Sequence, residues 1–208
     1  MPDWLELSCV PREKKECRSN CFPSGRYGHS ATLVGIKNIL VFGGLADGDK
    51  KYEKTIWKHD AHNSLSELDL TNEMYVLKLN IRANKLLREK NVWSRIKYES
   101  ANIPAPRWKH TATKIGASEI VIYGGLSDGV NRVAFNGIWV FNCADNTWKN
   151  KEVSATKYRG SHTACGIDRQ IYIIGGYGGD YPFSRSYLSD VCILDTTTWK
   201  VTQVRRKV

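Results

Sequence analysis

The sequence predicts an all-β protein built from repeated sheets of four short strands, and three observations lead to this prediction. A heptad of the form Arg-x-x-His-[Ser/Thr]-Ala-x occurs three times, at residues 26–32, 107–113 and 159–165. Each heptad is followed by an apolar run that ends in a double glycine, at 43–44, 124–125 and 175–176. No segment keeps a 3.6-residue apolar period, so long helices are not expected.

Each unit continues in the same order after its double glycine. A second apolar run begins at Met74, Ile138 and Val191, and the units close with Trp93, Trp148 and Trp199. Equivalent positions of the second and third units lie 51 to 52 residues apart, whereas 81 residues separate the first two heptad histidines. The segments between polar turns are short and rich in Val, Ile, Tyr and Trp, which is typical of β-strands.

The glycines and tryptophans have physical reasons to recur in such units. A double glycine ends the second strand where the chain must turn sharply, because glycine reaches positive φ without a steric cost. One large aromatic side chain per unit fills the gap between two adjacent sheets. A period near 50 residues with four strands per unit is typical of sheets stacked radially around an axis.

On these motifs the units resemble kelch repeats, and nearly the whole chain resembles a kelch-type β-propeller. The resemblance implies three four-stranded blades plus an N-terminal strand of a further blade, that is, a partial propeller. The expected divisions are a closing strand and linker at 1–25, blade 1 with long insertions at 26–98, blade 2 at 99–152 and blade 3 at 153–208. The third-strand tyrosine of the family is Tyr75 in unit one but Trp139 and Cys192 in the others, which is a variation in packing.

Three blades are fewer than the four to eight of a closed propeller. At the start of the chain, the segment DWLEL places Trp4 where a closing tryptophan would stand, as in the fourth strand of another blade. We therefore expect an N-terminal fragment of a larger propeller. A homodimer that completes a six-bladed ring and an open half-ring are the alternatives, and the open ring would expose unpaired strand edges.

The charge of the chain bears on its partners. Lys and Arg exceed Asp and Glu by 31 to 21, a net charge of +10, which favours acidic peptides, phosphorylated segments or nucleic acid. The charge is spread along the chain, so a basic surface without a dedicated partner also accounts for it. The N-terminus does not read as a signal peptide and no apolar run could span a membrane. Cysteines within strand-like runs suggest reduced thiols and a cytoplasmic, possibly nuclear, protein.

The heptad arginines are the first candidate site residues. The resemblance implies that an arginine after a proline turn can point into the central pocket and hold an acidic side chain. Arg107 in PAPRWKH fits best, while Arg26 and Arg159 fit less closely. A guanidinium matches a carboxylate or phosphate with two parallel hydrogen bonds. An inter-blade salt bridge is the alternative role, and the heptad histidines are expected to hydrogen-bond the backbone.

Further candidates lie beside Arg107 and in the loops that join the second and third strands. Interfaces favour Trp, Tyr and Arg, and YGGDYPFSRSY at 177–187 is the richest stretch. The predicted partner contacts beyond the arginines are Trp108, Lys51, Tyr52, Arg132, Tyr177, Tyr181, Phe183 and Arg185. For the 177–187 stretch, the alternative is a loop that packs its own aromatic side chains.

No catalytic set is recognisable in the sequence. HDAH at 59–62 has too few ligands for a metal site, and GGYGGD at 175–180 lacks the Lys-[Ser/Thr] of a phosphate-binding loop. We expect no cofactor, no metal and no catalysis within these residues. The predicted function is a protein–protein interaction module that binds an acidic or phosphorylated partner, with nucleic acid unlikely. The alternative is a regulatory kelch domain of a larger enzyme, such as a serine/threonine protein phosphatase, or a ubiquitin-ligase adaptor.

Overall fold

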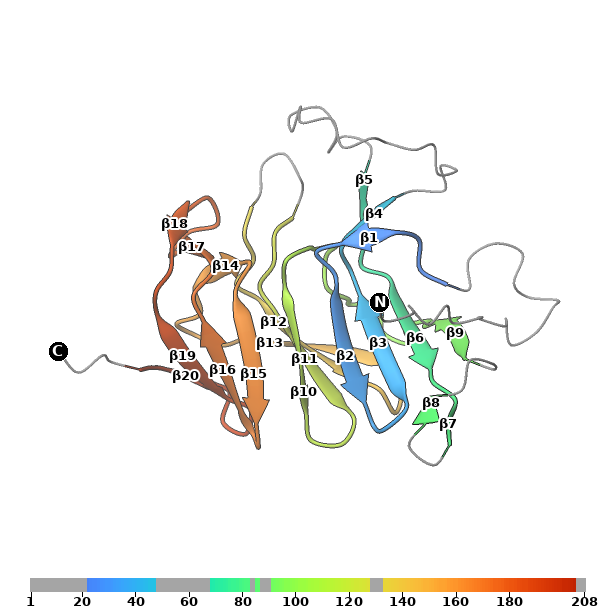
Figure 1. The fold of residues 1–208 in the computed structure, drawn as a ribbon. Coiled ribbons are helices and arrows are strands. Elements are labelled where there is room, and N and C mark those ends of the chain that lie inside the picture. Colours follow the sequence, from blue (N-terminus) through green and yellow to red (C-terminus); the bar gives the residue numbers. More distant parts are fainter. Residues whose placement is uncertain (1–21, 48–67, 83–84, 87–90, 128–132, 205–208) are drawn as a thin grey trace, which may run out of the picture.

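Three four-stranded antiparallel sheets, stacked side by side, make up most of the molecule (Figure 1). This computed structural model describes residues 22–47, 68–82, 85–86, 91–127 and 133–204. Within those ranges every regular element is a β-strand. The all-β prediction and the kelch-type blade architecture are therefore confirmed.

Each sheet is one blade, with its strands in chain order. Blade 1 contains β2 (Ser30–Val34), β3 (Asn38–Phe42), β6 (Met74–Lys78) and β9 (Val92–Arg95). Blade 2 contains β10 (Thr111–Ile115), β11 (Glu119–Tyr123), β12 (Ile138–Asn142) and β13 (Thr147–Lys151). Blade 3 contains β15 (Thr163–Ile167), β16 (Gln170–Ile174), β19 (Val191–Asp195) and β20 (Lys200–Gln203).

Smaller sheets extend the blades beyond the double glycines, an extension that the sequence did not predict. One sheet contains β1 (Arg26–Tyr27), β4 (Leu45–Asp47) and β5 (Leu68–Leu70), and another contains β14 (Tyr158–Gly160), β17 (Tyr177–Gly179) and β18 (Ser186–Tyr187). In blade 2 the isolated bridges from Leu126 to Trp108 and to Ala134 take their place. We call this end of the blades the GG end, and the opposite end, with the turns between first and second strands, the turn end.

The insertion before the fourth strand of blade 1 forms a short hairpin. It pairs β7 (Ile81–Arg82) with β8 (Lys85–Leu86). The longer insertion before β6 falls largely at 48–67, and the expected N-terminal strand around Trp4 falls at 1–21; both lie outside the described residues. The described residues contain no helix with the length and apolar character needed to cross a membrane.

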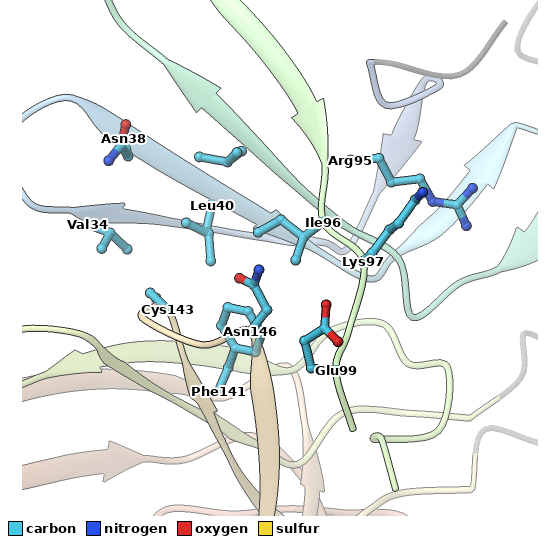
Figure 2. Close-up of a pocket in the computed structure, with 11 residues that line it drawn as sticks. Val34, Asn38, Leu40, Arg95, Ile96, Lys97, Glu99, Phe141, Cys143 and Asn146 are labelled. Atoms are coloured by element: carbon cyan, nitrogen blue, oxygen red, sulfur yellow. The ribbon is translucent and has the colours of Figure 1, made fainter. Parts of the chain in front are cut away.

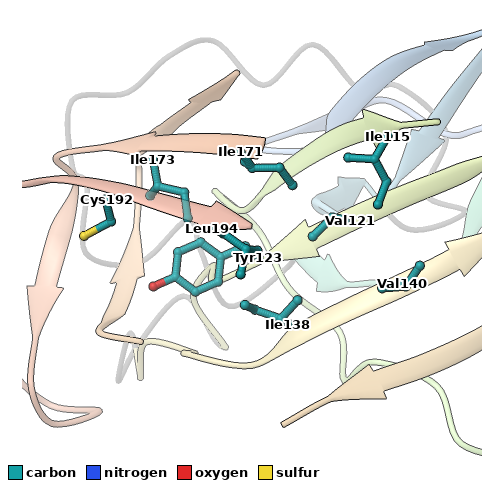
Figure 3. Packing of buried hydrophobic residues seen from close by; sticks show 9 residues of the cluster. All are labelled: Ile115, Val121, Tyr123, Ile138, Val140, Ile171, Ile173, Cys192 and Leu194. Carbon is teal, nitrogen blue, oxygen red and sulfur yellow. The ribbon is translucent and has the colours of Figure 1, made fainter. Parts of the chain in front are cut away.

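The cores lie between neighbouring blades. Figure 3 shows the core between blades 2 and 3, where side chains of β10, β11 and β12 face those of β16 and β19. Trp148 of β13 contributes to the other core, between blades 1 and 2, where its ring lies 5.3 Å from that of Phe42 and 4.9 Å from that of Phe141. This tryptophan therefore fills the space between two sheets, as the sequence predicted.

Trp199 does not hold the position in blade 3 that Trp148 holds in blade 2. Trp148 pairs with Phe141, and the corresponding register in blade 3 pairs Val201 with Leu194. Trp199 lies two residues earlier, in the turn before β20, with a φ of 53°. It still packs against the core between blades 2 and 3, but from a different place.

The double glycines do more than turn the chain. The six residues have φ between 62° and 104°, as predicted. In addition, the Gly44 N–H donates to the Arg107 carbonyl at 2.9 Å, and the Gly125 N–H donates to the Arg159 carbonyl at 2.8 Å. The double glycines of blades 1 and 2 thus hydrogen-bond the heptad of the next blade. A Cβ on Gly43 would lie 2.7 Å from the Arg107 carbonyl oxygen, so this close approach requires glycine.

The histidines of blades 2 and 3 each bond a side-chain hydroxyl, whereas His29 of blade 1 hydrogen-bonds the Arg26 backbone, as expected. His110 Nε2 lies 2.8 Å from Ser30 Oγ, and His162 Nε2 lies 2.8 Å from Thr111 Oγ1. Each bond joins the histidine of one blade to the heptad hydroxyl of the preceding blade. The Ser/Thr that follows the heptad histidine is thereby explained as the acceptor or donor for the next blade.

Candidate functional site

The side chains of the three heptad arginines are buried at the GG end. The Nη1 group of each arginine donates to the carbonyl of the first glycine in its own blade. The donor–acceptor distances are 3.2 Å for Arg26, 2.9 Å for Arg107 and 2.7 Å for Arg159. The side chain of Arg26 is 3% exposed, and Arg107 and Arg159 are 2% and 1% exposed. These hydrogen bonds link the segment before the first strand of each blade to the end of its second strand.

Two of these arginines are paired with the residue that precedes the third strand. Arg159 donates through both terminal nitrogens to the Asp190 carboxylate, at 2.9 and 2.8 Å. Arg26 lies 3.6 Å from the Glu73 carboxylate. Both ion pairs lie within one blade, so the role of inter-blade salt bridge does not describe them. Burial disfavours the Arg159 charge, yet the hydrogen bonds to Asp190 raise its pKa above the usual value.

Arg107 differs because blade 2 has Gly137 at the position of those acids. Its guanidinium lies 4.4 Å from the centre of the Phe135 ring, and its Nε donates to the Ala105 carbonyl. Burial lowers the pKa of Arg107 to about 10. Arg26 and Arg159 each contact a carboxylate of their own blade. Arg107 instead contacts the face of an aromatic ring of its own blade.

An exposed aromatic loop stands at the GG end of blade 3. Tyr181, Phe183 and Tyr187 are 73%, 71% and 90% exposed. The loop is nevertheless held in place, because the Ala134 N–H of blade 2 donates to the Pro182 carbonyl at 2.9 Å. The Tyr181 and Ser184 backbones also bond across the tip. We call residues 177–187 the aromatic loop.

The structure brings some predicted contacts together and separates others. Tyr177, Tyr181, Phe183 and Arg185 belong to the aromatic loop, and Arg185 is exposed. Trp108 is buried, with the Tyr27 ring edge-on at 5.6 Å, which gives it a packing role. Lys51, Tyr52 and Arg132 lie outside the described residues.

Sequence reasoning did not single out three residues of this region. Tyr187, the most exposed aromatic residue of the loop, pairs with Tyr177 across β17 and β18, and their rings lie 5.6 Å apart. Phe135 and Gly137 matter because they change the surroundings of Arg107. An alignment of the residues before each third strand would have found the last two.

This architecture is that of a kelch-type β-propeller, of which the structure describes three blades. It combines four-stranded blades, double glycines and arginines that hydrogen-bond those glycines. The profile of the KLHDC2/KLHL20/DRC7 Kelch-repeats domain family matches residues 66–207, and the chain belongs to this family. It is 31% identical over 159 residues to the dynein alpha chain of the flagellar outer arm of Chlamydomonas reinhardtii. It is also 29% identical over 180 residues to the F-box/kelch-repeat protein At1g51550 of Arabidopsis thaliana, and 29% identical over 162 residues to human host cell factor 1.

These relatives are much longer proteins. The matches cover 76%, 83% and 74% of this chain but 3%, 31% and 7% of the respective relatives. The chain therefore spans less than a third of the length of each of them. The match in this chain falls on its kelch domain, and kelch domains of this family are protein-interaction modules.

Proposed function

We propose that the GG end of this kelch domain binds an acidic or phosphorylated segment of a partner protein and performs no catalysis itself. The aromatic loop is the observation that carries the proposal. Three large aromatic side chains project into solvent within seven residues, 181–187, with exposed Arg185 among them. Aromatic and arginine side chains contribute most of the binding energy at protein interfaces, and exposed apolar clusters mark such surfaces.

The geometry of the loop supports a binding role. Its tip is bonded to blade 2 through Pro182, so its aromatic side chains are presented by a fixed backbone rather than a freely moving one. Preorganisation of this kind reduces the entropy lost on binding. The net charge of +10 on the chain attracts an acidic segment toward any face of the molecule, and Arg185 gives that segment a bidentate donor at this one.

A direct test uses a fluorescein-labelled peptide of alternating glutamate and phenylalanine and measures its fluorescence anisotropy with the intact chain. We expect the double variant Tyr181→Ser, Phe183→Ser to weaken binding at least tenfold, because it removes two exposed rings without touching the core. The variant Ile36→Ser is the matched control, since Ile36 is 81% exposed at the turn end. It should leave the affinity unchanged.

Three results would contradict the proposal. One is an equal affinity for a peptide in which lysine replaces glutamate, and another is full binding by the double variant. The third is tighter binding of a single-stranded oligonucleotide with a steep fall in affinity as salt rises, which would indicate a nucleic-acid partner. A phosphoserine peptide in the same assay separates phosphate recognition from general preference for acidic residues.

We also propose that two copies can pair through blade 3 and blade 1 to complete a six-bladed ring. Ile167 and Ile174 are 56% and 50% exposed on the face of blade 3 that looks away from blade 2. Thr163 stands on the same strand at the place of Ser30 and Thr111, the hydroxyls that bond a histidine of the next blade. His29 of a second copy would supply that histidine.

Sedimentation equilibrium tests this pairing. We expect twice the 23.6 kDa mass of one chain and a return to 23.6 kDa in Ile174→Glu, which places a charge in the apolar face. A single 23.6 kDa species at all concentrations of the unaltered chain would contradict the pairing. The peptide-binding proposal does not depend on this result.

The second candidate function is a regulatory kelch domain within a larger enzyme, such as a serine/threonine protein phosphatase, or within a ubiquitin-ligase adaptor. The short matched fraction of each relative favours this second function. In those proteins the region that matches this chain is one part of a much longer chain. Cys143, Cys165 and Cys192 are free thiols, which supports a reducing compartment, the cytoplasm or nucleus. Mass spectrometry of the endogenous protein would test the enzyme alternative by showing whether a catalytic domain is joined to these blades.

A further inference from the structure

A cavity of about 420 Å³ opens between blades 1 and 2, where turn-end residues of both blades meet the segment 95–99 at the end of β9 (Figure 2). Its floor is apolar and is formed by Val34, Leu40, Val76, Ile96 and Phe141. This volume lies within the range of about 300–1,000 Å³ that is usual for ligand sites. Protein interiors are otherwise close-packed, so a hollow of this size between two stacked sheets needs a cause.

The cause is found by comparison with the next pair of blades. The fourth strands begin at Thr147 in blade 2 and at Lys200 in blade 3, each paired with the last residue of the third strand. The residue just before is Asn146 in blade 2 and Trp199 in blade 3. Both have positive φ, 56° and 53°, so the two turns share one backbone conformation. The positions differ in side chain, an amide in one and an indole in the other.

Trp199 packs against the core between blades 2 and 3, and Asn146 lines the cavity between blades 1 and 2. The register of the sheets matches three residues of the cavity floor with three residues of that core. These pairs are Val34 with Ile115, Val76 with Val140, and Phe141 with Leu194. The cavity is therefore the space that an indole fills one blade further along the chain.

The charges at the rim also suit an aromatic ring. Between blades 2 and 3 the Lys151 ammonium lies 4.7 Å from the centre of the Trp199 ring. At the cavity, Arg95, Lys97 and Glu99 lie at the opening, and all three are exposed (Figure 2). The Arg95 guanidinium is ion-paired with the Glu73 carboxylate at 2.7 Å, so Lys97 is the cation placed to approach a ring. Cations attract the electron-rich face of an aromatic ring, and indole gives the strongest such attraction.

We propose that this cavity binds the indole of a tryptophan side chain from a partner protein. The occupant would take the place that Trp199 takes in the neighbouring interface, with its ring on the Phe141 and Leu40 side chains. The Lys97 ammonium would approach its face. Arg95 shares the Glu73 carboxylate with Arg26, but no residue that lines the cavity belongs to the aromatic loop, so the proposal does not rest on binding there.

Nuclear magnetic resonance titration of the ¹⁵N-labelled chain with N-acetyl-L-tryptophanamide tests the proposal. We expect saturable shifts of the Ile96, Phe141 and Asn146 amides, together with nuclear Overhauser contacts from the indole protons to the methyl groups of Val34 and Leu40. N-acetyl-L-leucinamide, the control probe, should bind at least fivefold more weakly because it lacks a ring face for the cations.

The variant Asn146→Trp gives the sharpest control. Trp199 shows that this turn accepts tryptophan, so the new indole should fill the cavity of its own chain, raise the melting temperature and abolish binding of the probe. Asn146→Ala should keep the site. Saturation without shifts at these amides, equal binding of the leucine probe, or unchanged binding by a folded Asn146→Trp variant would overturn the proposal. Tight binding of free indole without binding of N-acetyl-L-tryptophanamide would also overturn it, because a tryptophan residue of a partner protein is flanked by peptide groups. The Overhauser contacts in the unaltered chain decide the case if the variant does not fold.

Discussion

His110 Nε2 and Ser30 Oγ lie 2.8 Å apart across the boundary between blades 1 and 2, although 80 residues separate them in the chain. His162 and Thr111 repeat the same bond between blades 2 and 3. Burial, with a smaller effect of the neighbouring arginine charge, lowers the pKa of both imidazoles to about 3. Both bonds are therefore made by neutral histidine at physiological pH.

Acidification should destabilise the blades through these two imidazoles. Above pH 6.5 the histidines are neutral in both the folded and the unfolded chain, so their contribution is constant. Below that pH only the unfolded chain takes up protons, and the free energy of unfolding should fall by about 2 kcal/mol per imidazole by pH 5. Urea unfolding at pH 7 and pH 5 measures this loss. His162→Gln should reduce this loss by about 2 kcal/mol, the share of one imidazole. An unfolding free energy of the unaltered chain that is the same at pH 7 and pH 5 would contradict the assignment.

Gly137→Asp should stabilise blade 2 by giving Arg107 the carboxylate that Asp190 gives Arg159. The backbone accepts the change, because the φ of Gly137 is not positive and a Cβ there would meet only the Trp139 ring, at 3.5 Å. We expect a gain of about 1 to 2 kcal/mol in urea unfolding. The same substitution in an Arg107→Met background should destabilise the fold, because the new carboxylate then lacks a partner. A gain in both backgrounds would show that the ion pair is not its cause.

The cost of replacing a glycine can be divided into a part from steric contact of the new Cβ and a part from the positive φ. Gly43 and Gly35 have nearly the same φ, 66° and 62°, but a Cβ at Gly35 would have nothing within 4 Å. Gly35→Ala should therefore cost about 1 kcal/mol, from the strained backbone alone. Gly43→Ala should cost about 3 kcal/mol or more, because its Cβ would strike the Arg107 carbonyl and the His110 ring. Equal losses in thermal unfolding would mean that blade contact does not constrain this position.

Trp148→Ala should cost about 3–5 kcal/mol, as for other large buried aromatic side chains. Trp148 is 4% exposed and contacts the rings of Phe42, Tyr98 and Phe141. Trp93→Ala is the matched control, since Trp93 has the same place in its sheet but is only half-buried, and its loss should be smaller. Comparable losses in the two variants would show that burial between the blades does not set the cost.

The sheets could be predicted because the heptads and double glycines recur in the same order along the chain. The recurrence of glycine also has a physical explanation in the backbone conformation of the turn. The place of Trp199 was not predicted, since a period counted in residues does not reveal a side chain that moves by two positions within a turn. The cavity followed from that displacement and from side chains of two separate blades. The ion pair of Arg159 was not predicted, because its partner Asp190 lies 31 residues away in the chain. The binding role of the aromatic loop remains a prediction.

His110 and Thr111 are adjacent residues, yet one bonds back to blade 1 and the other forward to blade 3. Successive side chains of an extended chain point to opposite faces. This dipeptide therefore provides the histidine of one inter-blade hydrogen bond and the hydroxyl of the next. A gene duplication that copied one whole unit would bring both halves with it and leave no buried imidazole unpaired. The number of blades can therefore change by whole units in evolution without a compensating mutation at these positions.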